Sequence, residues 1–128
     1  MVARRGSTLA GALVGLALAV LALAPAAGAH AILVGSQPAA NAELVGAELD
    51  VEVSLEFNSR IDAARSSLQL AKDGGALQPL PLGETDKPNF LVGKAAKLAP
   101  GAYRLRWQVL SVDGHVSRGD VNFKVRAP

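Results

Sequence analysis

Residues 49–57 read Leu-Asp-Val-Glu-Val-Ser-Leu-Glu-Phe, an unbroken alternation of apolar and polar side chains. Successive side chains of a β-strand point to opposite faces, so this order places five apolar side chains on one face and four polar ones on the other. A helix would scatter the same residues around its axis. The segment therefore predicts a strand with one buried face.

The alternation recurs twice towards the C-terminus, at residues 102–112 and 120–125. In the first of these segments Tyr103 and Trp107 share the apolar face, and we expect both in the core. Shorter apolar segments that suit strands lie at residues 31–34, 67–70, 77–82 and 89–92. About seven short strands without helical periodicity are typical of two packed sheets. The sequence predicts an all-β fold, a Greek-key β-sandwich or barrel of immunoglobulin-like or cupredoxin-like appearance.

Turn-forming residues separate these segments. Lys72-Asp-Gly-Gly75 is typical of a hairpin, and Ala99-Pro-Gly101 of a tight turn before the longest strand. Asp113-Gly114 interrupts the last two predicted strands, and a histidine follows directly. We expect residues 38–46 to form a connecting loop.

The first 29 residues are typical of a secretory signal. Arg4 and Arg5 precede an uninterrupted run of Leu, Ala, Val and Gly at residues 9–24, and the run is followed by Ala27-Gly28-Ala29. The run is shorter than the roughly 20 residues of a membrane span, which argues against an uncleaved anchor. We expect cleavage after Ala29, which leaves residues 30–128 as one domain in the periplasm or outside the cell.

Charge and cysteine content exclude several classes of function. Arg4 and Arg5 are two of the 13 basic residues, so the 11 that follow residue 29 equal the 11 acidic ones. Without a basic excess, nucleic acid is not an expected partner. The chain has no cysteine, its only methionine is Met1, and its two histidines are His30 and His115. Any metal site must use imidazole, carboxylate and backbone donors.

The usual enzyme motifs are missing. The sequence contains neither a Gly-x-Ser-x-Gly elbow nor the glycine patterns that bind nucleotide phosphates. Ser111 and Ser117 flank Asp113 and His115, but all four lie too close together in sequence to predict a catalytic triad. We therefore expect a protein that is not an enzyme.

A metal site is the stronger interpretation. Cleavage after Ala29 gives His30 a free amine beside its own imidazole, and the two can chelate one ion. Asp113 and His115 lie two positions apart and point the same way on an extended chain, so we expect them to converge on one point, with Gly114 letting the backbone bend. Nitrogen and oxygen donors of this kind favour Cu(II). An interpretation without a metal stays open, in which Asp113 is an ordinary turn residue and His115 caps the turn.

Five motifs together resemble a known family, and they run almost the whole length of residues 30–128: His30-Ala-Ile-Leu-Val34, Pro38-Ala-Ala-Asn41, Leu55-Glu-Phe-Asn58 followed by Ile61-Asp62, Leu98-Ala-Pro-Gly-Ala-Tyr-Arg-Leu-Arg-Trp107, and Val112-Asp-Gly-His-Val-Ser-Arg-Gly119. The chain resembles the CopC family of periplasmic copper-binding proteins, which are Greek-key β-sandwiches. The resemblance implies one Cu(II) per chain with its ligands at His30, Asp113 and His115. It also implies a chaperone or buffer in copper resistance or homeostasis, with a membrane copper transporter of the CopD type as partner.

Two departures from the family pattern narrow this expectation. Many relatives carry a second, methionine-rich Cu(I) site, and this chain lacks the methionines, so it resembles the Cu(II)-only branch. Some relatives carry a glutamate where this chain has Ser59. We expect a soluble, monomeric carrier. Two alternatives stay open: a copper oxidase or monooxygenase with a histidine brace, and an interaction sandwich without metal.

Overall fold

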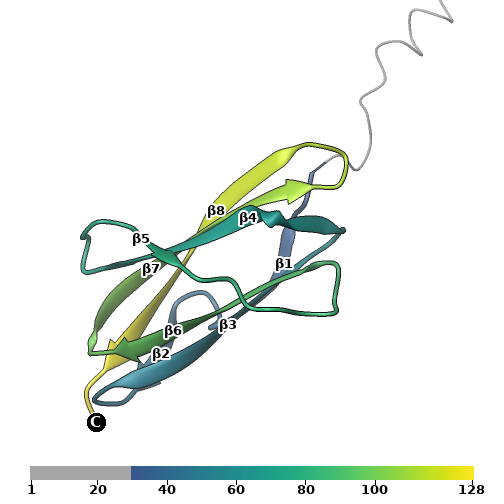
Figure 1. The fold of residues 1–128 in the computed structure, drawn as a ribbon. Coiled ribbons are helices and arrows are strands. Elements are labelled where there is room, and N and C mark those ends of the chain that lie inside the picture. The colour runs from purple at the N-terminus through teal and green to yellow at the C-terminus, as the bar shows by residue number, and fades with distance from the viewer. Residues whose placement is uncertain (1–29) are drawn as a thin grey trace, which may run out of the picture.

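The computed structural model describes residues 30–128, so the predicted signal segment lies outside the described residues. The described chain folds into two sheets that face each other (Figure 1). Among residues 30–128, no helix is long and apolar enough to cross a membrane. The strands are β1 (Leu33–Gln37), β2 (Ala42–Val45), β3 (Leu49–Phe57), β4 (Ile61–Lys72), β5 (Gln78–Leu80), β6 (Phe90–Leu98), β7 (Gly101–Ser111) and β8 (Val116–Arg126).

The two sheets have the strand orders β1-β3-β6 and β2-β8-β7-β4-β5. Neighbouring strands run antiparallel, except that β2 runs parallel to β8. Only two pairs of consecutive strands, β4 with β5 and β7 with β8, lie in the same sheet, and every other connection crosses from one sheet to the other. This arrangement confirms the predicted all-β sandwich, with eight strands in the described residues instead of about seven.

The additional strand corrects one prediction. Residues 38–46 were expected to form a loop, yet β2 lies within them and pairs with β8 from Ala42, opposite Phe123, to Val45, opposite Arg126. A four-residue segment has too little alternation to predict a strand. Its backbone hydrogen bonds depend on a partner that lies far away in the sequence.

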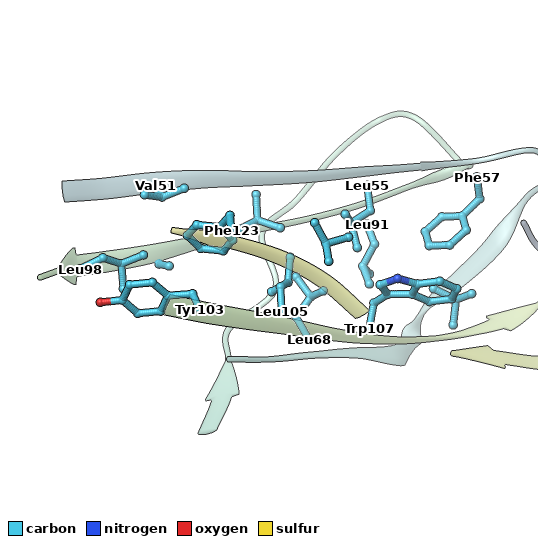
Figure 2. Packing of buried hydrophobic residues seen from close by; sticks show 14 of the residues in the cluster. Val51, Leu55, Phe57, Leu68, Leu91, Leu98, Tyr103, Leu105, Trp107 and Phe123 are labelled. Carbon is cyan, nitrogen blue, oxygen red and sulfur yellow. The ribbon is translucent and has the colours of Figure 1, made fainter. Parts of the chain in front are cut away.

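The core fills the space between the sheets. Figure 2 shows Val51, Leu55 and Phe57 of β3 facing the side chains of β7 across the sandwich. Tyr103 and Trp107 are only 5% and 7% exposed, which confirms their predicted place in the core. The rings of Phe57 and Trp107 make a T-shaped contact, with their centroids 5.1 Å apart and 70° between their planes.

Both predicted turns are present. Gly75 N donates to Lys72 O at 2.9 Å in the hairpin between β4 and β5. The turn that ends with Gly101 connects β6 to β7, in the other sheet. The longest pairing joins β7 to β8, from Gly101 opposite Val125 to Leu110 opposite Val116. In Figure 1 the tip of this hairpin and the start of β1 lie at the same end of the sandwich.

Candidate metal centre

The hairpin tip, residues 111–115, is a tight turn closed by its own backbone. Gly114 N donates to Ser111 O at 2.9 Å, and Ser111 N donates to His115 O at 2.8 Å. Gly114 has a φ of 91°, a conformation that glycine adopts without the strain of a Cβ atom. Three-residue hairpin loops commonly use a type I turn followed by such a residue. The Asp-Gly-His order therefore suits the turn that it forms.

This turn brings Asp113 and His115 together. Oδ1 of Asp113 lies 3.2 Å from Nδ1 of His115 and accepts a hydrogen bond from the His115 backbone N–H at 3.3 Å. The sequence predicted that the two side chains converge, with Gly114 letting the backbone bend. The side chains do meet where the chain reverses around Gly114, and not along an extended segment.

Ser111 lies beneath this pair and was missed as a site residue. Its hydroxyl donates to Oδ1 of Asp113 and lies 3.0 Å from the carbonyl oxygen of His115. The hydrogen bond from Ser111 is the main cause that lowers the pKa of Asp113 below its ordinary value, and His115 adds to the effect. A signal was present in the sequence, because Ser111 continues the inward register of Trp107 and Val109 with a polar side chain.

His30, the residue at the N-terminal end of the described chain, lies at the same place. Its ring centroid lies 5.1 Å from that of His115, with 73° between the ring planes. The segment after His30 is fixed by Asn58, whose side-chain Oδ1 accepts from Ile32 N at 2.8 Å and whose backbone N–H donates to Ile32 O at 2.9 Å. The fold therefore places the start of β1 beside the hairpin tip.

The predicted ligands meet in pairs. His30 contacts His115, and Asp113 contacts His115. Residues 30–128 contain no group of three or more His, Asp or Glu side chains close enough to hold a metal ion together. The two pairs provide imidazole nitrogen and carboxylate oxygen as metal donors, and no sulfur. Such a donor set suits Cu(II) better than Cu(I).

Comparison with known proteins places the chain in a family. The model of the CopC domain matches residues 33–126. The chain belongs to the CopC family. Protein YobA of Escherichia coli K12 is 32% identical over 116 residues, which cover 86% of this chain and 92% of YobA. The copper transport protein CutJ of Bacillus subtilis is 31% identical over 100 residues, which cover 76% of this chain but only 18% of CutJ.

Solved structures agree with the CopC assignment. CopC from Methylosinus trichosporium OB3b superposes with a TM-score of 0.67 at 33% identity, over 77% of this chain and 95% of that one. PcoC from Escherichia coli, a methionine-rich copper resistance protein, superposes with a TM-score of 0.64 at 25% identity, over 77% of this chain and all of PcoC. These matches confirm the family and the fold that the sequence motifs predicted. Unlike methionine-rich PcoC, this chain has Met1 as its only methionine.

Proposed function

We propose that the protein is an exported Cu(II)-binding protein that holds one ion per chain. The proposed ligands are the amine and imidazole of His30, the carboxylate of Asp113 and the imidazole of His115. The observation that carries the proposal is the 5.1 Å contact between the rings of His30 and His115. These are the only two histidines in the sequence, and they come from distant parts of the chain.

The contacts within the hairpin tip support a definite arrangement of donors. Nδ1 of His115 lies 3.2 Å from Oδ1 of Asp113, a separation that suits two neighbouring donors of one ion. We therefore assign Nδ1 of His115 to the metal, beside the carboxylate of Asp113. Asp113 would supply its negative charge to the ion.

We assign the protein to copper resistance or homeostasis, as a chaperone or buffer in the periplasm or outside the cell after loss of residues 1–29. The names of PcoC and CutJ, a copper resistance protein and a copper transport protein, support this role. We expect a monomer whose partner, besides the ion, is a membrane copper transporter of the CopD type. Nucleic acid is not an expected partner.

A carrier explains the molecule better than a copper monooxygenase does. An enzyme that acts on a polysaccharide would need exposed aromatic rings near its metal. Trp107 and Tyr103 are 7% and 5% exposed, and both pack between the sheets. Neither ring is available as a flat binding surface, which supports binding and transfer of copper rather than oxidation.

Ligand substitution tests the proposed site in a chain that begins at His30. His115→Ala should lower Cu(II) affinity more than about 100-fold, the upper end for residues that only orient ligands. Asp113→Asn should cost less, because an amide oxygen remains. Asp86→Asn, which removes an exposed carboxylate outside the hairpin tip, is the control. Competition titration measures the affinities, and an unchanged affinity in His115→Ala would contradict the proposal.

A further inference from the structure

Ser111 stands apart from every other residue of the described chain. Among residues 30–128 it is the one polar residue in the buried core, at 4% exposure. Ser111 is the last residue of β7. Its side chain points inward, as the apolar side chains of Val109 and Trp107 do two and four residues earlier. An apolar residue would extend the core at this place, so the presence of a buried hydroxyl here calls for an explanation.

The contacts of Ser111 supply that explanation. Its backbone N–H and C=O close the turn, at 2.8 Å to His115 O and 2.9 Å to Gly114 N. Its hydroxyl lies within hydrogen-bond distance of Asp113 Oδ1 and of His115 O. A hydroxyl has one hydrogen, and a carboxylate is a stronger acceptor than a carbonyl that is already hydrogen-bonded. The hydroxyl therefore donates to Asp113.

We propose that Ser111 is the positioning residue of the copper site: it binds no metal itself but holds the Asp113 carboxylate beside the His115 ring, in the geometry that the ion needs. This inference rests on the proposed function. The Asp113 side chain is 43% exposed, so little packing restrains it. Ser111 holds Oδ1 from one side, and the other side of Oδ1 faces Nδ1 of His115, where the ion would bind between the two side chains.

A second serine, Ser66, serves as a matched control. Its hydroxyl supports the fold near Ser111, so it separates an effect on the site from an effect on the fold. Ser66 Oγ donates to Asp62 O at 2.7 Å and accepts from Leu110 N at 3.2 Å. It ties a bulge of β4 to β7 next to Ser111, but it contacts none of the proposed ligands. Loss of the Ser66 hydroxyl should affect the fold and spare the site.

The test compares Ser111→Ala, Ser111→Thr and Ser66→Ala in chains that begin at His30. Ser111→Ala should lower Cu(II) affinity about 10- to 100-fold in a competition titration, as is usual for residues that orient ligands. It should also change the electron paramagnetic resonance spectrum and speed removal of Cu(II) by a chelator. Ser111→Thr keeps the hydroxyl and should restore affinity, and Ser66→Ala should keep the wild-type affinity and spectrum.

A second readout needs no metal. In the metal-free protein, the amide heteronuclear Overhauser effects of residues 113–115 should fall in Ser111→Ala and stay at the wild-type level in Ser66→Ala. Wild-type affinity and unchanged amide order in Ser111→Ala would overturn the role of Ser111, as would an equal loss of affinity in Ser66→Ala. If the wild-type chain itself fails to bind Cu(II), the proposed function fails, and the amide order alone then decides whether Ser111 positions Asp113.

Discussion

Substitution of Gly114 would change the conformation of the hairpin tip but leave the side chains of Asp113 and His115 chemically unchanged. Its φ is 91°, and an added Cβ would find no heavy atom within 4 Å, so a side chain there meets backbone strain but no clash. Gly114→Ala should destabilise the fold by about 1–2 kcal/mol. It should also weaken Cu(II) binding, because the turn that joins Asp113 to His115 is displaced.

Gly74 offers a matched control for this prediction. It has a φ of 73° and equally open surroundings, but it lies in the hairpin between β4 and β5. Gly74→Ala should cost similar stability in urea unfolding and leave the Cu(II) affinity unchanged. Equal losses of affinity in both variants would mean that the effect is general destabilisation and not a change at the site.

Copper binding should weaken in acid because of the nitrogen donors. An α-amine and an imidazole bind metal only after they lose their protons, and their ordinary pKa values are about 8 and 6.5. The hydrogen bond from Ser111 lowers the pKa of Asp113, so this carboxylate stays ionised through the range in which the nitrogens take up protons. Cu(II) affinity should therefore drop steeply below about pH 6. Affinity that stays constant from pH 7 to pH 5 would argue against nitrogen donors. A preference for Zn(II) over Cu(II) would argue against a copper site.

At the scale of single strands, the sequence predicted best where one alternation runs without a break. β3 spans Leu49–Phe57, the nine residues from which the strand was predicted. β4 was predicted only at residues 67–70, yet it begins at Ile61, because a bulge between Asp62 and Ser67 interrupts the alternation. The bulge is stabilised by Ser66, whose contacts with β7 could not be known from local sequence.

Gly119 explains why β8 was predicted too short. The strand begins at Val116, four residues before the predicted start at 120, and the intervening glycine weakens the strand pattern. The structure gives this glycine a packing role: an added Cβ would lie 2.6 Å from Cζ2 of Trp107. The indole of Trp107 covers the backbone of β8 at this point, so contact across the hairpin selects glycine over a good strand former.

Replacement of this glycine should damage the hairpin. Gly119→Ala forces the rigid indole of Trp107 to move and should destabilise the fold by about 1–3 kcal/mol. Gly35→Ala is the control, because its nearest neighbour is the flexible Glu56 side chain at 3.4 Å, and its effect should stay within about 0.5 kcal/mol. Urea unfolding followed by the fluorescence of Trp107 measures both. A Gly119→Ala chain as stable as wild type would show that the packing around Trp107 is looser than described.

At the scale of the whole molecule, the sequence predicted the sandwich and the family, and it selected the residues that come together at one end. It could not predict how they meet. The 5.1 Å contact of His30 with His115 depends on where β1 starts relative to the β7–β8 hairpin, which is a property of the assembled sheets. Ser111 was overlooked for the same reason, since only the closed turn shows what its buried hydroxyl contacts.

The central claim is that the copper ion is chelated by the first residue of the processed protein. The most direct measurement compares the Cu(II) affinity of a chain that begins at His30 with that of the same chain carrying one additional glycine before His30. The glycine converts the His30 amine into an amide and moves the free amine one residue away, while both imidazoles and the carboxylate of Asp113 remain. The account predicts that the added glycine lowers the affinity by orders of magnitude, with fewer nitrogen donors in the electron paramagnetic resonance spectrum and an unchanged fold. Equal affinity in the two chains would contradict it.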